Sequence, residues 1–356
     1  MSTDKSFAGK SLLVVGGAGF VGSNLIRMLL RMGPQKVTIV DNFLSSERIN
    51  IPNDDRINLI NGSVADARVI AQLPGDLDYA WHLACYHGNQ SSIHDPIADH
   101  DNNTLTSLML FDALSKRSNL VKVVYSAAGC AVAEKTYDAP AATPEDAPVS
   151  LFHDSPYSIS KLVGEMYGNY YFTRYGMPFV KARFQNVYGP GEILGAGRWR
   201  GTYATVWRNV TPTFIWKALH NEILGLDNGG LVSRDFIFVE DICRGLVACA
   251  LTGKSGEAYN IASGVETTIK QLAETIIELT KSKSELVIQP ARNWDNSGRR
   301  FGSTEKSSQE LGFSASVDLQ TGLESTIAWT RSNLEVIRSS IEKHSLQMSE
   351  IEKPLG

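Results

Sequence analysis

The chain has 356 residues, 43% of them hydrophobic and 20% charged, which is typical of a globular protein with one large domain or two. Its formal net charge of −4 gives no electrostatic reason to expect nucleic acid or a membrane as a partner. The seven histidines lack metal-ligand spacing, the four cysteines form no CxxC pair, and the first ten residues lack the apolar core of a signal peptide, so we expect a cytoplasmic protein without metal or disulfides.

Short apolar runs alternate with amphipathic segments over the first 180 residues. This pattern predicts buried strands at residues 11–16, 36–41, 57–62, 79–84, 121–126 and 179–184. Helices are predicted between them, at residues 21–32, 103–116 and 158–174. Strict alternation of strand and helix indicates the α/β class with a Rossmann-type doubly wound parallel sheet.

The pattern changes after "NVYGPGE", residues 186–192. Residues 193–209 are rich in Gly, Arg and Trp without a clear period and are predicted to be a loop. Mixed elements follow, with helices at 213–221 and 269–280, a strand and helix over 234–251, a strand at 285–290 and a helical tail. We expect a dinucleotide-binding Rossmann domain (1–183 plus 234–262) and a smaller mixed α/β domain over one edge of the sheet (184–233 plus 263–345).

A glycine-rich turn in "LLVVGGAGFVGSNLIRMLL" joins the first predicted strand to the first helix. Gly16, Gly19 and Gly22 have GxxGxxG spacing, which lets the backbone approach a pyrophosphate at the positive end of the helix. Asp41 ends the next strand, where its carboxylate can accept both ribose hydroxyls of NAD and repel the 2′-phosphate of NADP. The combination predicts NAD as cofactor rather than a purely structural turn.

A second signal lies in "SPYSISKLVGEMYGNYY". Tyr157 and Lys161 are four residues apart, so a helix places both on one face. An ammonium beside a phenol would lower the pKa of the phenol and make it a usable base. YxxxK also arises by chance on amphipathic helices, but after an NAD fingerprint the catalytic interpretation is favoured.

With these residues in place, the chain resembles an extended short-chain dehydrogenase/reductase of the NAD-dependent nucleotide-sugar epimerase/dehydratase family. The resemblance runs from about Gly9 to about Trp329 and follows the family's order of motifs: "GGAGFVGSNL", "DNFLSS", "WHLAC", "SSIHDP", "DNNTLTSLML", "PYSISK", "RFQNVYGP", "NVTPTF" and "RDFIFVEDI". It implies Tyr157 as catalytic base and Lys161 as a ligand of the nicotinamide ribose. It also implies cofactor contacts from Gly16, Gly19, Phe20, Val21, Asp41, Asn42, Ser45, Ser46, Ser63, Leu83, Ala84 and Asn103. Ser63 departs from the family's usual Asp, which weakens that contact.

The substrate is implied to be a nucleotide-diphosphate sugar. Asn186 and Asn209 match family asparagines that face it, and Arg234 with Arg299 or Arg300 match arginines that bind its diphosphate. Tyr86, His87 and Ser92 lie in a segment that borders substrate in the family. The run "GRWRGTYATVWRN" is either a substrate lid with base-stacking aromatics or a surface loop, and the sequence leaves both open.

The family's catalytic hydroxyl is missing from "YSAAGC". Ser126 is the only hydroxyl there and is predicted to lie within the strand, so no Ser or Thr of this stretch completes the triad. The side chains that follow Ser126 are small, at Ala127, Ala128 and Gly129, which predicts room there for a substituent of the sugar. Cys130 is either a small packed hydrophobe or a thiol acid/base.

Three reactions, C4 epimerisation, 3,5-epimerisation and 4,6-dehydration or decarboxylation, and one non-catalytic function remain open on these residues. Family dehydratases and decarboxylases carry acidic residues where this chain has Gly129 and Cys130, which favours C4 epimerisation through a transient 4-keto sugar. A 3,5-epimerase-like reaction could use Cys130, but the position of its lysine partner holds Asn209. The missing hydroxyl also leaves a different class open, a catalytically impaired NAD-responsive binding protein.

A homodimer is expected as well, because family members pair through two helices of the Rossmann domain. Leu105, Leu108, Met109 and Tyr167 offer apolar surface at helical spacing for such a four-helix contact, although the same residues could pack inward.

Overall fold

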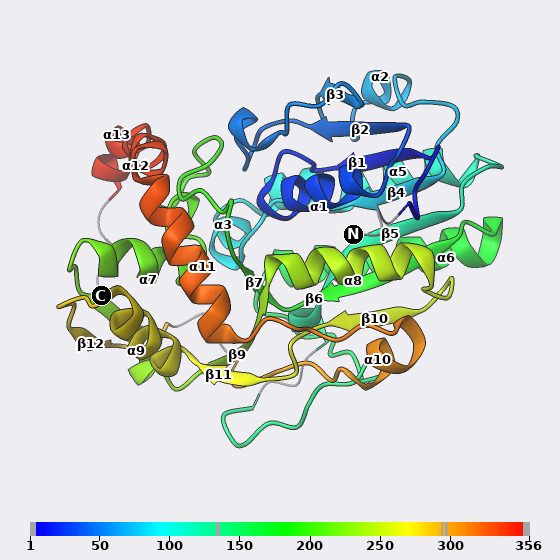
Figure 1. Ribbon diagram of the computed structural model, residues 1–356. Helices are drawn as coiled ribbons and strands as arrows, with labels where there is room; N and C mark the ends of the chain where they lie inside the picture. The colour runs from blue at the N-terminus through cyan, green and yellow to red at the C-terminus, as the bar shows by residue number, and fades with distance from the viewer. Residues whose placement is uncertain (1–4, 133–135, 293–294, 296–297, 352–356) are drawn as a thin grey trace.

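A seven-stranded parallel sheet forms the centre of the molecule in the computed structural model, which describes residues 5–132, 136–292, 295 and 298–351 (Figure 1). From one edge to the other, its strands are β3 (Ile57–Asn61), β2 (Lys36–Asp41), β1 (Ser11–Val15), β4 (Tyr79–His82), β5 (Lys122–Ala128), β6 (Phe179–Phe184) and β10 (Ala258–Ile261). All neighbouring pairs are parallel. The predicted Rossmann-type fold is therefore confirmed. Strand order reverses between β1 and β4, where such sheets bind ligands.

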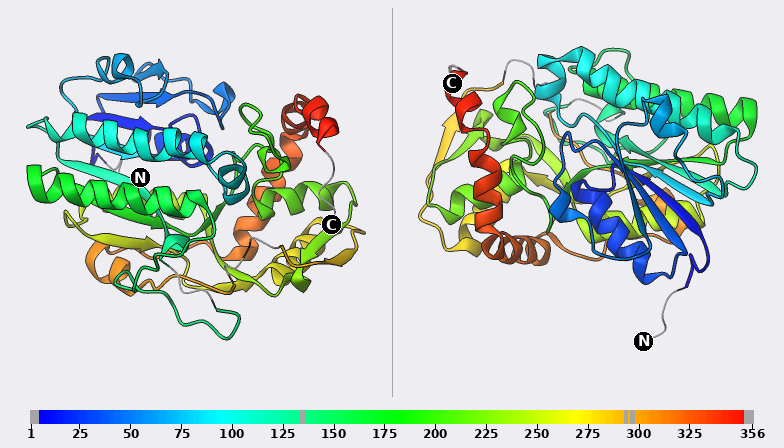
Figure 2. Two further views of the ribbon diagram at one scale, coloured as in Figure 1. Left: turned by 180° about the vertical axis from the view of Figure 1, so that it is seen from behind. Right: turned by 90° about the horizontal axis from the view of Figure 1, so that it is seen from above.

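Helices cover both faces of this sheet, which is why β1 and β4 read as continuous apolar runs. One face carries α1 (Phe20–Arg31) and α8 (Val239–Leu251), and the other carries α5 (Leu105–Ser115) and α6 (Pro156–Tyr175) (Figures 1 and 2). A π-helical turn, His100–Thr104, leads into α5. Shorter helices are α2 (Ala67–Ile70), α3 (Asn89–His94), α4 (Pro96–Asp99) and α10 (Glu305–Leu311).

Local signals set both ends of α6. The Ser155 hydroxyl accepts a hydrogen bond from the Ser158 amide, and Pro156 occupies the first turn. Gly176 ends the helix in the left-handed conformation, with φ 70°. These caps fix Tyr157 in the first turn, at the end that faces the carboxyl edge of the sheet.

The second part of the molecule has its own small sheets and core. β7 (Asn186–Tyr188), β9 (Ser233–Phe238) and β11 (Glu266–Thr268) form one sheet, and β8 (Leu224–Asp227) pairs with β12 (Leu286–Gln289). Phe214, Leu272 and Leu323 join α7 (Val210–Leu219), α9 (Ile269–Thr280) and α11 (Leu319–Ser332) in one core. The chain continues into α12 (Leu334–Glu342) and α13 (Ser345–Glu350).

Strand pairing bears on where the two domains divide. β9 lies in the three-stranded sheet, whereas α8 packs on the large sheet and β10 extends it. We therefore propose the division after Phe238, rather than before residue 234. Residues 1–4 and 133–135 of the predicted first range lie outside the described residues.

In the described part of the chain, no helix has an apolar stretch long enough to cross a membrane.

Candidate active site

A cavity of about 790 Å³ lies where the carboxyl edge of the large sheet meets the second part of the molecule. Gly16, Asp41, Ala84 and Ser126 line it from β1, β2, β4 and β5, and Phe214 lines it from α7. Its volume is in the usual range for small-molecule sites.

The glycine turn permits contacts that side chains would block. Gly16 has φ +85°, and a Cβ there would lie 2.5 Å from the Ala84 nitrogen. A Cβ on Gly22 would lie 2.2 Å from the Gly16 oxygen, so α1 can approach β1 closely. Gly19 caps α1 without a side chain, which leaves the first turn of the helix open to the cavity.

Asp41 is held rigidly at the cavity wall. Its Oδ2 accepts from the Ala18 amide at 2.9 Å, and its Oδ1 accepts from the Phe43 amide at 2.9 Å and the Ser46 hydroxyl at 2.8 Å. A carboxylate has about four acceptor sites, so about one is left, on Oδ2, for a ribose hydroxyl. Together with the glycine turn, this geometry fits the adenosine and pyrophosphate of NAD.

Almost all of the predicted cofactor residues share this cavity. The lining includes Gly16, Gly19, Phe20, Val21, Asp41, Asn42, Ser45, Ser46, Ser63, Leu83, Ala84, Tyr157 and Lys161. Asn103 is not among them. Its amide accepts from the Tyr86 nitrogen at 2.7 Å and donates to Ser160 at 3.1 Å, so it lies behind the wall and ties the segment after β4 to α6.

Tyr157, Lys161 and Ser126 meet at the end of β5. The Lys161 Nζ donates to the Ser126 carbonyl at 2.8 Å, lies 3.4 Å from the Ser126 Oγ and is 5.9 Å from the centroid of the Tyr157 ring. Ser126 also donates its hydroxyl to the His82 carbonyl at 2.9 Å. Within the described residues, no side chain hydrogen-bonds to the Tyr157 hydroxyl.

The pKa values of this pair depart from the sequence-based expectation of a lowered phenol pKa. Burial raises the pKa of Tyr157 well above its ordinary value, and the nearby Cys85 and Cys130 raise it further. Burial also lowers the pKa of Lys161. Burial is the largest cause of the raised phenol pKa, and the Lys161 ammonium donates its hydrogen bond to the Ser126 carbonyl rather than to the phenol.

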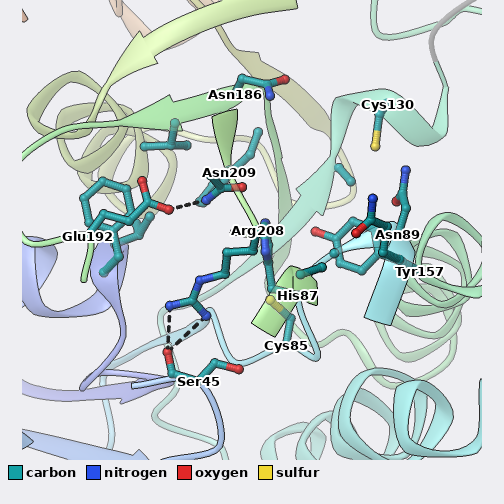
Figure 3. Close-up of a pocket in the computed structure, with 18 of the residues that line it drawn as sticks. Ser45, Cys85, His87, Asn89, Cys130, Tyr157, Asn186, Glu192, Arg208 and Asn209 are labelled. Atoms are coloured by element: carbon teal, nitrogen blue, oxygen red, sulfur yellow. Dashed lines mark hydrogen bonds between the residues drawn. The ribbon is translucent and has the colours of Figure 1, made fainter. Parts of the chain in front are cut away.

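Gly129 and Cys130 follow β5 in a single 3₁₀ turn, Gly129–Ala131. A Cβ on Gly129 would lie 2.2 Å from the Gln185 Nε2, so the space expected for a sugar substituent is taken next to this residue by a protein side chain. Cys130 packs with Tyr157 and Leu162 in a small apolar cluster and also lines the cavity (Figure 3).

The segment after β4 places its three predicted substrate residues differently. His87 lines the cavity, and its ring meets the Tyr157 ring edge-on at 5.9 Å. Burial, with the nearby cations Arg208, Arg200 and Lys161, lowers the pKa of His87 to about 3, so this imidazole is neutral at pH 7. Ser92 and Tyr86 lie outside the lining, where the Ser92 hydroxyl accepts from the Tyr157 amide at 3.2 Å.

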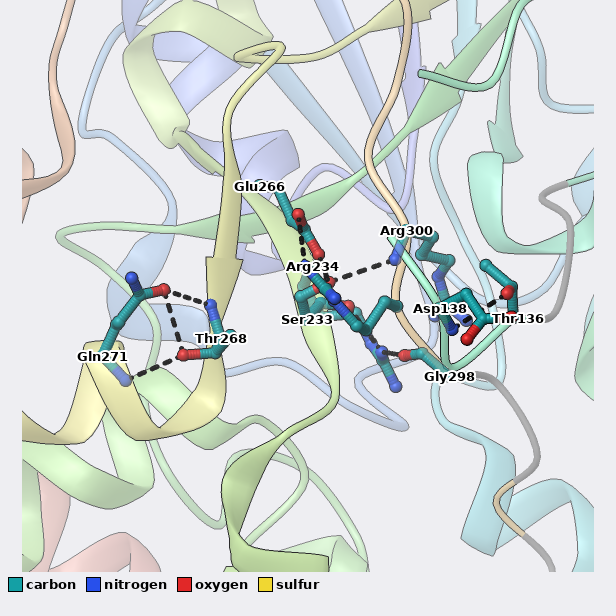
Figure 4. Close-up of polar contacts among 10 residues, drawn as sticks. Thr136, Asp138, Ser233, Arg234, Glu266, Thr268, Gln271, Gly298 and Arg300 are labelled. Atoms are coloured by element: carbon teal, nitrogen blue, oxygen red, sulfur yellow. Dashed lines mark hydrogen bonds and ion pairs between the residues drawn. The ribbon is translucent and has the colours of Figure 1, made fainter. Parts of the chain in front are cut away.

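The predicted diphosphate-binding arginines also separate, and Figure 4 shows two of them, Arg234 and Arg300. Arg234 and Arg300 line the cavity, and Arg234 Nη1 donates to the Ser233 and Gly298 carbonyls at 2.7 Å each. Burial lowers the pKa of Arg234 to about 9. Arg299 is absent from the lining and pairs with both oxygens of Glu266, at 2.8 and 3.0 Å. Of the two alternatives, Arg300 is therefore the one that faces the cavity.

Residues 193–209 cover the cavity beside the loop after β2. The Arg198 amide donates to the Leu44 carbonyl at 3.0 Å, and Arg200 Nη1 donates to the Ser45 hydroxyl at 2.7 Å. Trp207 lines the cavity, whereas the Trp199 ring lies against His344 on the other side of the loop. Of the two alternatives that the sequence left open, this arrangement favours the substrate lid over the surface loop.

Several polar cavity residues had no distinct signal in the sequence. Asn186 and Asn209 line the cavity as predicted, but so do Gln185, Glu192 and Arg208. The Asn209 amide donates to Glu192, and Arg208 reaches the Ser45 carbonyl (Figure 3). A lone Glu after a glycine turn and one Arg among several in a loop do not stand out without the fold.

Comparison with known proteins agrees with this geometry. A sequence profile described as the NAD dependent epimerase/dehydratase family matches residues 12–262. The chain belongs to this family. It is thus an NAD-dependent enzyme of nucleotide-sugar metabolism, as the sequence predicted.

The similar proteins include both epimerases and dehydratases. The Bordetella bronchiseptica enzyme WbmF, solved with NAD+ and UDP, is 55% identical with a TM-score of 0.87, over 96% of this chain and 98% of that one. A putative UDP-glucose 4-epimerase of Methanocaldococcus jannaschii is 28% identical over 90% of this chain and 99% of its own length. A dTDP-glucose 4,6-dehydratase of Streptomyces antibioticus is 27% identical over 91% of this chain and 93% of its own. The family is shared, whereas the reactions of its members differ.

Proposed function

We propose that the protein inverts C4 of a sugar carried on UDP, through a transient 4-keto sugar. The observation that carries the proposal is the surroundings of Tyr157, where Lys161, Ser126, His87 and Cys130 are neighbours and no carboxyl group contacts the phenol within the described residues. C4 epimerisation needs one acid/base, whereas dehydration needs further acidic groups. UDP is proposed because of the similarity to WbmF, which was solved with that nucleotide.

The chain's own residues supply binding and proton transfer. Asp41 and the glycine turn hold NAD, which serves as hydride acceptor and then donor. Tyr157 takes the proton of the sugar's 4-hydroxyl and later returns it. Arg234 and Arg300, which line the cavity, bind the diphosphate, and the keto sugar turns between the two steps.

A second candidate is exchange of ring protons at C3 or C5, because Cys130 lines the cavity and belongs to the same small apolar cluster as Tyr157. Asn209 still stands where that chemistry would have its lysine. Simple C4 epimerisation is therefore preferred.

Incubating the NAD-loaded protein with UDP-glucose, UDP-galactose and their N-acetyl and uronic acid forms tests the proposal. We expect transient NADH absorbance and a C4 epimer, detected by NMR, with at least one of them. Failure of every nucleotide sugar to reduce NAD would instead favour the NAD-responsive binding protein.

A further inference from the structure

Glu192 is a buried carboxyl group of the cavity to which the reaction above assigns no role. It follows the turn after β7, lines the cavity and is 5% exposed. Its Oε1 accepts a hydrogen bond from the Asn209 Nδ2 (Figure 3). Within the described residues its Oε2 is buried without a hydrogen-bond partner. Such a buried oxygen is costly unless a ligand or a proton satisfies it.

The Asn209 side-chain amide can turn over when the protonation state of Glu192 changes. It is the N-cap residue of α7, yet its side chain makes no capping hydrogen bond, and within the described residues its amide bonds only to Glu192. An ionised carboxylate can only accept hydrogen bonds, so it requires the NH₂ group of the amide to turn towards it. The amide then offers its carbonyl oxygen to the cavity.

A protonated Glu192 permits the opposite arrangement. Its O–H can donate to the Asn209 carbonyl oxygen, and the NH₂ group can then point at the ligand. Phosphate oxygens of a nucleotide-diphosphate sugar are acceptors, so only this second arrangement suits them. The argument rests on the proposed function, which supplies this class of ligand.

We propose that Glu192 is a positioning residue for the nucleotide-sugar ligand: by gaining a proton it turns the Asn209 amide so that NH₂ faces the diphosphate. Ligand binding therefore takes up one proton. Glu192 is not required to touch the reacting carbon, and its effect is expected on affinity rather than on hydride transfer.

The surroundings of Glu192 bring the pKa of its carboxyl group into the physiological pH range. Burial raises the pKa of Glu192 to about 7, against the opposing effects of the Arg208 guanidinium and the Asn209 bond. Besides Glu192, the charged groups that shift the pKa of Arg208 are Cys85 and Glu47. The first turn of α1 contains no acidic residue. His87 is neutral at pH 7 and adds no charge. A dianionic diphosphate favours the protonated form further.

Affinity for UDP-glucose as a function of pH tests the proposal, with NAD-loaded protein and calorimetry in buffers of different ionisation enthalpy. The diphosphate diester of this probe does not titrate near neutral pH. We expect its Kd to rise about tenfold between about pH 6 and about pH 8, because only the protonated fraction binds, with nearly one proton taken up at the higher pH.

Two variants identify the side chains that cause the pH dependence of the Kd. Glu192→Gln is permanently neutral and can donate to the Asn209 carbonyl, so we expect the affinity of the unmodified protein at low pH and no pH dependence. Asn209→Ala removes the amide that turns, so binding should weaken and the pH dependence should flatten.

Asp227→Asn is the matched control. Asp227 lines the same cavity but pairs with Arg292, with Asp227 Oδ2 and Arg292 Nε 2.6 Å apart, so this change should leave the pH dependence intact. Tight binding with no pH dependence would overturn the proposal and leave the proposed function standing. Persistence of the pH dependence in Glu192→Gln or Asn209→Ala, or its loss in Asp227→Asn, would overturn it too. Absence of UDP-glucose binding at every pH would overturn both.

Discussion

The cofactor half and the substrate half of the cavity differ in how their polar groups are paired. On the cofactor side, Asp41 already accepts three hydrogen bonds from Ala18, Phe43 and Ser46. On the substrate side, His87 Nδ1, Glu192 Oε2 and Thr213 Oγ1 are buried without partners within the described residues. Each such atom costs on the order of 1–3 kcal/mol.

The difference indicates that the two halves are specified in different ways. The polar groups of the adenosine side are paired before a ligand arrives, and residues 16–46, from one strand–helix–strand unit, contribute most of that side. The substrate half keeps unpaired polar atoms that a ligand can satisfy, and it is assembled from segments as distant as residues 87 and 300. Changes on the cofactor side should therefore affect NAD itself, whereas those on the substrate side should affect selectivity and proton handling.

The largest effect is expected at the boundary between the halves, from Tyr157→Phe. NAD reduction by substrate should fall about 10²–10⁴-fold, with substrate affinity nearly unchanged, because the phenol acts mainly as charge develops. Stopped-flow absorbance of NADH measures it. In the unmodified protein the rate should rise with pH, since burial keeps the phenol protonated at neutral pH.

Tyr137→Phe is the control for this change. Tyr137 lines the same cavity, but its hydroxyl only reaches the Asp295 carbonyl at 3.4 Å. Its turnover should stay close to that of the unmodified protein. Activity that survived Tyr157→Phe would move the base to another residue.

The cofactor half is tested by Asp41→Asn. NAD should bind about 10–100-fold more weakly, because charge-assisted hydrogen bonds to the ribose are lost, and discrimination against NADP should relax. Titration with both cofactors measures this, with thermal unfolding as a check because Asp41 also holds the Ala18 and Phe43 amides. Equal preference for NAD and NADP in the unmodified protein would refute the role of Asp41.

The substrate half is tested by Cys130→Ala with solvent deuterium. If C4 epimerisation is the only reaction, no deuterium should enter the ring with either protein, and turnover should change by less than about tenfold, because the thiol contributes packing alone. NMR of the product measures the exchange. Deuterium at C3 or C5 that disappeared in the variant would establish the alternative chemistry and make Cys130 a catalytic thiol.

The smallest effect on catalysis is expected at the outer face of α6, where we propose that two copies meet. Ile159, Met166 and Tyr170 are 48%, 57% and 52% exposed there and follow helical spacing. Of the residues expected to pair, Leu105, Leu108, Met109 and Tyr167 are partly buried within one chain. Met166→Glu should convert a dimer into monomers in light scattering, whereas Ile288→Glu, on the exposed β12, should not. A monomeric mass for the unmodified protein at micromolar concentration would contradict the pairing.

Contiguous motifs could be predicted because short-range geometry determines them. The glycine turn, Asp41 at the end of its strand, and the spacing of Tyr157 and Lys161 each depend on neighbours within one strand–helix unit. The same holds for the six strands predicted for the Rossmann sheet, whose apolar runs reflect burial on both faces. β7 and β11 have three residues each, too few for a periodic pattern, and were missed.

Tertiary structure alone decided which polar side chains reach the cavity. Arg299 and Arg300 are neighbours in sequence, yet successive side chains point in different directions, and only the partner Glu266 on β11 distinguishes them. Asn103 lies behind the wall because the segment after β4 folds over it, and Glu192 meets Asn209 only because the turn after β7 reaches the start of α7. The direction of the Tyr157 pKa shift could not be predicted from the sequence either. Helical spacing gives only the distance between Tyr157 and Lys161, whereas the shift is caused mainly by burial, which depends on every segment that packs around the phenol.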